Sequence, residues 1–195
     1  MKIAIDLDKT LIDCDSFIYW VANKFFSKPS EKNLKFNLIF TGNEGSDGLI
    51  SKFLSKFSKM GKPESYFQIP NAIDVVNSWY DKGIEIYILS SRPNFSSLNY
   101  ALHQYFLKMN LKYSAMIVNC NNKASFCERF NIDLLIDNSP LICLDAMNIG
   151  VDVICLNDAI FDEKFKNMIF ANNWKQLNDI ILNKYLAVKN TGINH

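Results

Sequence analysis

The chain has 195 residues, 49% of them hydrophobic and 21% charged, which is typical of a globular protein with a substantial core. Its formal net charge of +1 favours neither a nucleic acid polymer nor a membrane surface as partner, and no uncharged apolar run approaches the roughly 20 residues of a membrane span. An aspartate interrupts the apolar N-terminus that a signal peptide needs, and five cysteines show no disulfide or zinc pattern, so we expect a protein of the reducing cytoplasm.

Short apolar runs rich in β-branched residues recur along the chain, with helix-like segments between them. Apolar residues at helical spacing predict helices over 71–82, 96–109 and 173–186. Two more are predicted, one that begins at Lys123 and one that begins at Pro140 with Ser139 as its N-cap. Continuous apolar strands that alternate with such helices are typical of an α/β fold, a doubly wound, Rossmann-like parallel sheet covered on both faces. The predicted strands are 3–7, 84–89, 115–118, 134–136, 151–156 and, with a weaker pattern, 168–170.

One stretch departs from this alternation of strands and helices. The residues between the first strand and the helix at 71 contain no convincing strand, and their apolar spacing predicts only helices. We therefore expect an α/β core made of residues 1–13 and 69–195, with an all-helical insertion over residues 14–68. The last residues, 187–195, are expected to form a loose tail. The helices predicted in the insertion are 15–26, 33–40 and 49–60.

Two aspartates, Asp6 and Asp8, directly follow the first buried strand. Buried charge without a partner is unfavourable, so a core strand rarely ends in paired carboxylates unless something positive neutralises them. In an open α/β sheet, ligands bind at the carboxyl ends of the strands. Only two histidines are present, so any chemistry here must rely mainly on carboxylates. Taken alone, however, the pair could also simply begin a loop and cap the following turn.

Polar and charged side chains follow other predicted strands in the same way. Because the carboxyl ends of parallel strands meet at one edge of a sheet, we expect these side chains to converge with Asp6 and Asp8. If these side chains did not converge, the presence of a polar residue after each strand would need its own explanation. They are Ser90, Ser91 and Arg92 after residues 84–89, Asp137 after residues 134–136, and Lys123 at the start of the helix between these two strands.

Several nearby polar residues have simpler explanations. Asp13 and Asp15 are expected to cap the first helix of the insertion. Asp133 precedes its strand and is expected to face away from the edge that holds the other acids, and Lys9 is expected to be tolerated rather than catalytic. Arg92 is left open between a substrate contact and a structural ion pair.

In order and spacing, these residues resemble the four motifs of the haloacid dehalogenase (HAD) superfamily. Residues 6–10, Asp-Leu-Asp-Lys-Thr, are similar to its D-x-D-x-T motif, and the apolar strand that ends at Ser90 is similar to its second motif. Lys123 matches the lysine of the third motif, and Asp137 matches the acid of the fourth. The resemblance covers the whole chain except residues 14–68, which lie where the superfamily carries its C1 cap.

The resemblance implies a magnesium-dependent phosphatase with a role for each residue. Asp6 would be the nucleophile that forms an aspartyl phosphate, and Asp8 would act first as the acid and then as the base. Mg²⁺ would bind the carboxylates of Asp6 and Asp137 and the backbone carbonyl of Asp8. Ser90 and Lys123 would bind the phosphoryl oxygens. Dehalogenases of the superfamily lack an acid at the position of Asp8, so its presence favours phosphoryl transfer.

The second half of the chain also resembles the 5′(3′)-deoxyribonucleotidase family and its bacterial relatives. That resemblance implies a nucleoside monophosphate as the substrate, with Ser91 and Arg92 as candidate substrate-binding residues. The family usually has two adjacent acids in its fourth motif, whereas Asn138 follows Asp137 here, so we expect weaker binding of Mg²⁺. The matching segments are 88–93, 133–140, 150–154 and Asn-Asn-Trp at 172–174.

Two other functions stay open. The first motif followed by Asp15 and Ser16 is also similar to phosphatases of the phosphoserine phosphatase type, which act on other small phosphomonoesters. A non-catalytic relative could instead bind a phosphorylated ligand or partner protein with the same fold, although a binding module needs no proton donor at Asp8. The partner expected for either enzyme is a small phosphorylated substrate, and the oligomeric state is not predicted.

Overall fold

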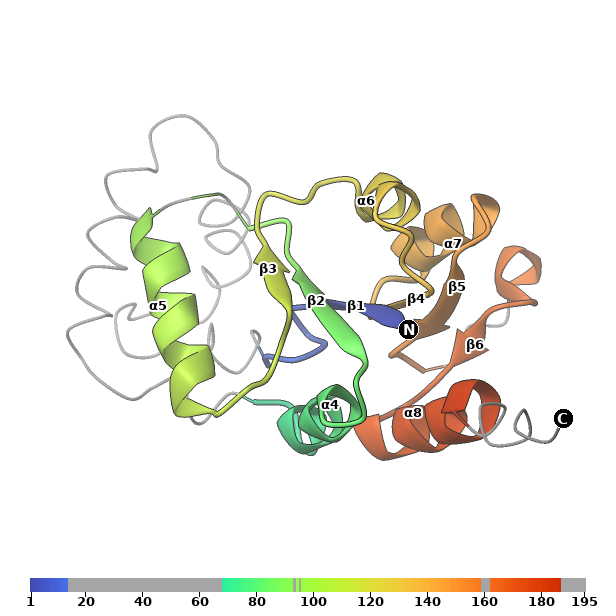
Figure 1. The fold of residues 1–195 in the computed structure, drawn as a ribbon. Coiled ribbons are helices and arrows are strands. Elements are labelled where there is room, and N and C mark those ends of the chain that lie inside the picture. The colour runs from blue at the N-terminus through green and yellow to red at the C-terminus, as the bar shows by residue number, and fades with distance from the viewer. Residues whose placement is uncertain (14–67, 93, 95, 159–161, 187–195) are drawn as a thin grey trace, which may run out of the picture.

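The computed structural model describes residues 1–13, 68–92, 94, 96–158 and 162–186. At its centre lies a six-stranded sheet in which every neighbouring pair is parallel, in the order β3-β2-β1-β4-β5-β6 (Figure 1). All the predicted strands are confirmed, and their ends differ from the predicted ends by a single residue at most. The strands are β1 (Lys2–Asp6), β2 (Glu85–Leu89), β3 (Ala115–Ile117), β4 (Leu134–Asp137), β5 (Asp152–Cys155) and β6 (Ile169–Phe170).

Helices cover both faces of this sheet. Helices α4, α5 and α8 contribute side chains to one hydrophobic core, whereas α6 and α7 contribute to another. Figure 1 shows α4 and α8 on one side of the strands and α6 and α7 on the opposite side, so the doubly wound α/β fold is confirmed. The helices are α4 (Ala72–Tyr80), α5 (Ser96–Lys108), α6 (Lys123–Arg129), α7 (Pro140–Asn148), the 3-10 turn η3 (Glu163–Phe165), α8 (Trp174–Ile181) and the π-helical η4 (Leu182–Leu186).

The central strand β1 shows why the strands of the sheet can be recognised in the sequence. Ile3 and Ile5 belong to the core that includes α4 and α8, whereas Ala4 belongs to the core that includes α6 and α7. Successive side chains of a strand point to opposite faces, so a strand that is buried on both faces must be apolar throughout. This burial explains the continuous apolar runs of the sequence.

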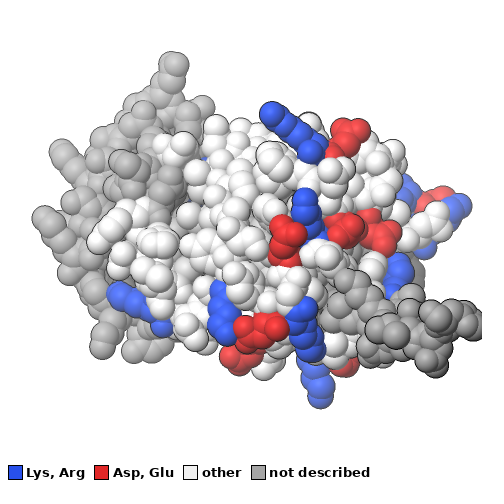
Figure 2. Space-filling view, viewed as in Figure 1, with Lys and Arg blue, Asp and Glu red and all other residues white. Residues whose placement is uncertain are grey.

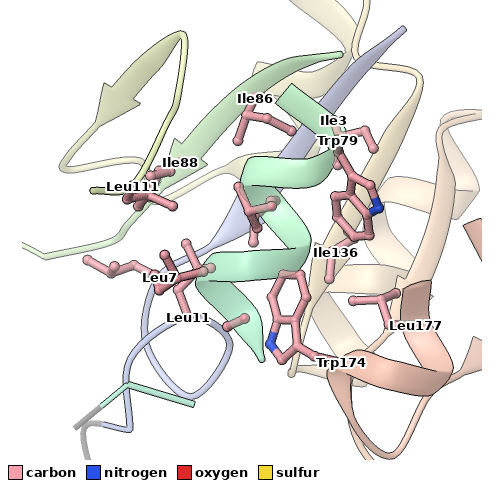
Figure 3. Close-up of a cluster of buried hydrophobic side chains, with 14 of the residues drawn as sticks. Ile3, Leu7, Leu11, Trp79, Ile86, Ile88, Leu111, Ile136, Trp174 and Leu177 are labelled. Carbon is pink, nitrogen blue, oxygen red and sulfur yellow. The ribbon is translucent and has the colours of Figure 1, made fainter. Parts of the chain in front are cut away.

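Two tryptophans pack together in the first of these cores. Trp79 and Trp174 are fully buried, and their ring centroids lie 5.7 Å apart (Figure 3). Trp174 Nε1 donates a hydrogen bond to the backbone carbonyl of Thr10 at 2.7 Å. Trp79 Nε1 donates to Asn178 Oδ1 at 2.8 Å. The first of these bonds ties α8 to the loop that follows β1, across 164 residues of sequence.

The helix ends largely follow the signals in the sequence. Gly83, with a φ of 80°, donates its N–H to the carbonyl of Tyr80 at 2.9 Å and so closes the end of α4. The side chains of Asn122 and Asn173 cap α6 and α8. Ser139 is the N-cap residue of α7, but its side chain makes no capping hydrogen bond. The predicted helix over 173–186 is divided into α8 and η4.

Some predictions fall outside the described part of the chain. The insertion over residues 14–68, apart from residue 68, and the tail over 187–195 lie there, so the division into core and cap stays a prediction. None of the described helices is long and apolar enough to cross a membrane. On the face shown in Figure 2, acidic and basic side chains of the described residues lie next to one another, as the net charge of +1 suggests.

The two tryptophan hydrogen bonds give different predictions for matched substitutions. We expect Trp174→Phe to lower the free energy of unfolding by about 2–3 kcal/mol, because it leaves the buried carbonyl of Thr10 without this donor. Trp79→Phe should have an effect about 1 kcal/mol smaller, because the partly buried Asn178 can turn its amide towards water. Urea denaturation of both variants tests the difference, and equal losses would contradict it.

Candidate active site

The sheet brings the carboxyl ends of β1, β2 and β4 side by side. Asp6 is the last residue of β1, and Asp137 is the last residue of β4. These two strands pair in parallel up to the residue before each aspartate, so both carboxylates lie at the same edge. On the other side of β1, Asp6 pairs with Leu89, which places Ser90 directly beyond it. This is the edge where open α/β sheets bind ligands.

One buried ammonium group joins the two aspartates. Lys123 is the first residue of α6, and its Nζ lies 2.5 Å from Asp6 Oδ1 and 2.6 Å from Asp137 Oδ2. The side chains of Lys123, Asp6 and Asp137 are only 5%, 8% and 1% exposed. Their expected convergence is therefore confirmed, and charge-assisted hydrogen bonds hold them together.

The buried group carries more negative than positive charge. Burial, followed by the negative charge of Asp137, raises the pKa of Asp6 to about 7, although Lys123 acts in the opposite direction. Burial by itself would lower the pKa of Lys123, but the two carboxylates outweigh it and raise this pKa. One ammonium does not balance two ionised carboxylates, so a further cation would favour the ionised form of Asp6.

A second hydrogen bond holds each of the two aspartates. The Thr10 hydroxyl donates to Asp6 Oδ2 at 3.0 Å, and the backbone N–H of Ser139 donates to Asp137 Oδ1 at 2.8 Å. Thr10 is itself buried, and its carbonyl accepts the bond from Trp174. No separate role was expected for Thr10 from the sequence, although it is the last residue of the D-x-D-x-T motif. The motif was the available signal, but only the loop conformation shows which carboxylate the hydroxyl reaches.

Ser90 is fully buried just beyond the end of β2. Its backbone N–H donates to the carbonyl of Ile117, and its own carbonyl accepts from the N–H of Cys120, both at 2.9 Å. Its hydroxyl oxygen accepts the N–H of Arg92 at 3.1 Å. A hydroxyl that accepts a bond still has its own hydrogen to donate, so Ser90 can donate to a phosphoryl oxygen at this edge.

Asp8 pairs with Arg92 rather than with Lys123. Arg92 Nε lies 2.9 Å from Asp8 Oδ2 and 3.1 Å from Asp8 Oδ1, and Nη2 also bonds Oδ1. The Arg92 side chain is 11% exposed and the Asp8 side chain 30%. Of the two explanations that the sequence left open for Arg92, the structure shows the ion pair. A direct contact between Arg92 and the substrate stays a prediction.

Ser91 is exposed and lines a cavity of about 310 Å³. Lys123 lines the same cavity, together with the polar residues Asn121, Asn122 and Asp145. The cavity therefore borders the buried charge cluster and offers both polar and apolar groups to a ligand. Its position is compatible with a substrate-binding role for Ser91, which stays a prediction.

Of the lesser residues, Asp133 lies where the sequence indicated. Asp133 Oδ2 accepts the backbone N–H of Lys2 at 2.6 Å, which places it at the opposite edge of the sheet from Asp137. Lys9, which lies between Asp8 and Thr10 in the loop after β1, has a backbone φ of 63°. This left-handed conformation favours glycine, so the lysine adopts a backbone conformation that is uncommon for its type.

The donor set at the edge fits a hard divalent cation. Proteins often bind Mg²⁺ through one or two carboxylates, and water and substrate phosphate fill the remaining positions. Asp6 and Asp137 supply two carboxylates, and the backbone carbonyl of Asp8 follows in the loop after β1. Within the described ranges, no group of three or more Asp, Glu, His or Cys side chains could hold a metal by itself. The arrangement fits a cation shared with a phosphorylated ligand better than a structural metal.

Comparisons with known proteins point to one fold. No family model matches the chain, and no curated protein matches it. Among solved structures, a HAD phosphatase from Thermococcus onnurineus is similar with a TM-score of 0.56 and 18% identity, over 93% of this chain and 98% of that one. A dehalogenase with an intermediate complex has a TM-score of 0.62 and 13% identity, over 92% and 96%. A candidate HAD-hydrolase from Bacillus subtilis, bound to magnesium, has a TM-score of 0.59 and 11% identity, over 92% and 97%.

The fold of this chain is therefore that of the HAD-superfamily hydrolases. At 11% to 18% identity, these likenesses establish the fold and not the reaction. The similar structures include both a phosphatase and a dehalogenase, so the choice between the two reactions depends on the residues of the site.

The position of the Lys123 ammonium between two carboxylates leads to a prediction about the stability of the fold. We expect Lys123→Met to lower the free energy of unfolding by about 3 kcal/mol in a chelator, because Asp6 and Asp137 are left as buried like charges. Millimolar Mg²⁺ should restore part of this loss, because the cation replaces the missing positive charge. Thermal and urea unfolding, with and without Mg²⁺, measure both effects.

Lys112→Met is the matched control for this prediction. Lys112 pairs with Asp81 on the surface, where the two side chains are 39% and 58% exposed. Its replacement should change the stability by about 0.5 kcal/mol or less and should show no dependence on Mg²⁺. Equal losses in the two variants would show that Lys123 does not balance a buried charge.

Proposed function

We propose that this chain is a magnesium-dependent phosphomonoester hydrolase that acts through an aspartyl phosphate on Asp6. The observation that carries the proposal is the buried group in which the Lys123 ammonium bridges Asp6 and Asp137 at the ligand-binding edge of the sheet. This group combines a carboxylate nucleophile, a donor for phosphoryl oxygens and oxygen ligands for a divalent cation. Phosphoryl transfer needs all three.

The reaction would proceed in two displacements at phosphorus. In the first, an oxygen of Asp6 attacks phosphorus, the bond to the leaving oxygen breaks, and Asp8 gives its proton to that oxygen. In the second, water attacks the phosphoryl group, Asp8 takes the proton from the water, and the bond between phosphorus and Asp6 breaks. Inorganic phosphate leaves, and both aspartates return to their starting states.

The remaining residues would stabilise charge and hold geometry. Lys123 and the hydroxyl of Ser90 would donate to the phosphoryl oxygens, where negative charge gathers during transfer. The Thr10 hydroxyl holds one oxygen of Asp6 and so limits rotation of the nucleophile. Mg²⁺, held by Asp6, Asp137 and the Asp8 carbonyl, would supply charge stabilisation on the phosphoryl group.

Asp8 supports a phosphatase rather than a dehalogenase. Hydrolysis of a phosphate ester needs a proton donor for the leaving oxygen, whereas displacement of a halide does not. Asp8 follows the nucleophile by two residues, and its side chain is 30% exposed, so it can reach both a leaving group and water. A non-catalytic phosphate-binding module would have no use for this acid.

For the substrate, we propose a nucleoside monophosphate. The support is the resemblance of the β2, β4 and β5 regions to the 5′(3′)-deoxyribonucleotidases, together with the cavity of mixed polar and apolar lining that borders Lys123. Another small phosphomonoester, as used by phosphatases of the phosphoserine phosphatase type, is the second candidate. Turnover of nucleoside monophosphates beside sugar, amino-acid and lipid-headgroup phosphates separates the two.

The nucleophile gives the direct test of the proposed activity. We expect the purified protein to hydrolyse an aryl phosphate or one of these monoesters only with Mg²⁺, and Asp6→Asn to lower kcat by about 10³-fold or more. The amide keeps the shape of the carboxylate but cannot attack phosphorus. Release of inorganic phosphate is the measurement.

Asp133→Asn is the matched control, because Asp133 lies at the opposite edge of the sheet and an amide oxygen can still accept the bond from Lys2. This variant should keep its activity. Mg²⁺-dependent turnover that survives Asp6→Asn would exclude Asp6 as the nucleophile, and hydrolysis without any divalent cation would contradict the proposed cofactor.

A second prediction concerns the residue after Asp137. Asn138 is half-buried and carries no charge, so we expect Asn138→Asp to lower the dissociation constant for Mg²⁺ by about 10-fold. Titration calorimetry of the metal measures this change. Asn148→Asp, which adds the same charge at the exposed end of α7, should leave the affinity unchanged. Unchanged affinity in both variants would show that Asn138 does not limit metal binding.

A further inference from the structure

The pair formed by Asp8 and Arg92 differs from an ordinary surface ion pair. Arg92 Nε contacts both oxygens of Asp8, at 2.9 and 3.1 Å, and Nη2 also bonds Oδ1. A guanidinium that binds a carboxylate at more than one point fixes the direction of the carboxylate as well as its distance. Both side chains are mostly shielded from water, at 11% and 30% exposure.

The backbone of Arg92 is held by two strands of the sheet. Its N–H donates to Ser90 Oγ at 3.1 Å, at the end of β2. Its carbonyl accepts the N–H of Asn119 at 2.8 Å, just beyond the end of β3. Asp8 follows β1, so the ion pair connects the ends of three neighbouring strands.

Asp8 depends on this pair for its orientation. Among the described residues, Arg92 makes all the hydrogen bonds and ion pairs to the Asp8 carboxylate. Asp6, in contrast, is held by Lys123 and by the Thr10 hydroxyl. The proposed nucleophile, Asp6, and the proposed proton-transfer group, Asp8, are thus oriented by separate partners. A substitution of Arg92 should therefore change the orientation of Asp8 and leave that of Asp6 unchanged.

We propose that Arg92 is a positioning residue that acts on the reaction through Asp8 rather than by binding the substrate phosphate. This inference rests on the proposed function, in which Asp8 transfers the protons. The phosphoryl oxygens already have Lys123 and Ser90 as donors at this edge. Arg92 instead holds the Asp8 carboxylate where it can meet the leaving oxygen and the attacking water, and a displacement of about 1 Å can lower a rate by about 10²-fold.

A double-mutant cycle tests this assignment with the monoester that the protein hydrolyses fastest. We expect Arg92→Ala to lower kcat by about 10²-fold and to change KM by less than about 3-fold. Arg92→Lys should recover part of kcat, because an ammonium supplies the charge but not the two-point geometry. In an Asp8→Asn background, Arg92→Ala should have almost no further effect on kcat, because its action passes through Asp8.

Binding of inorganic phosphate in the presence of Mg²⁺ provides a measurement without turnover. Its dissociation constant should be the same in the native protein and in Arg92→Ala. The matched control is Arg129→Ala, which removes the exposed arginine at the end of α6 and should leave kcat, KM and phosphate binding unchanged. Thermal unfolding of each variant confirms that it is folded before the rates are compared.

The alternatives give different results. A rise in KM and in the phosphate dissociation constant on Arg92→Ala, persisting in the Asp8→Asn background, would make Arg92 a substrate ligand and overturn the proposal. Unchanged kcat in Arg92→Ala would also overturn it. If the native protein hydrolyses no monoester while binding Mg²⁺ and phosphate, the proposed function itself fails, and the role of Arg92 fails with it.

Discussion

Lys123 places its ammonium group between two carboxylates that end neighbouring strands, in a part of the sheet from which water is nearly excluded. Without this positive charge, the edge of the sheet would hold Asp6 and Asp137 as buried like charges, which is strongly unfavourable. The same ammonium is the natural donor for a phosphoryl group that arrives there. Under the proposed function, folding of the ligand-free protein and binding of the ligand would both depend on this side chain. A bound phosphate with its cation would then supply part of the charge balance that the lysine supplies alone.

Two separate groups of charged side chains lie at this edge, and they differ in their exposure to water. The cluster around Asp6 is buried and suits a nucleophile and a metal ligand, because its position is tightly held and its charge is not screened by water. The pair of Asp8 and Arg92 is more exposed, and proton transfer to a leaving group and from water requires this access. The parallel sheet makes the division possible, since β1 supplies both aspartates while β2, β4 and the start of α6 supply their separate partners.

The fold alone does not choose the reaction. Proteins with the same architecture include a phosphatase and a dehalogenase at comparable structural similarity. Under the proposed function, the acid two residues after Asp6 would decide between these chemistries, and this chain has Asp8 there. Under the proposed function, substrate choice would depend on groups further from phosphorus, and the residues that line the cavity beside Lys123 are candidates. The function of this protein is therefore a property of a few side chains placed on a widely shared sheet.

The pattern of residues along the chain was enough to predict the sheet and most of the buried cluster. Strands buried on both faces must be apolar throughout, and parallel strands bring their carboxyl ends together, so Asp6, Lys123 and Asp137 could be expected to meet. The pairing of Arg92 with Asp8, 84 residues away, and the bond from Trp174 to the carbonyl of Thr10 are seen first in the folded chain. These contacts depend on loop conformation and on side-chain rotamers set by packing between distant segments, and no local pattern of residues encodes them.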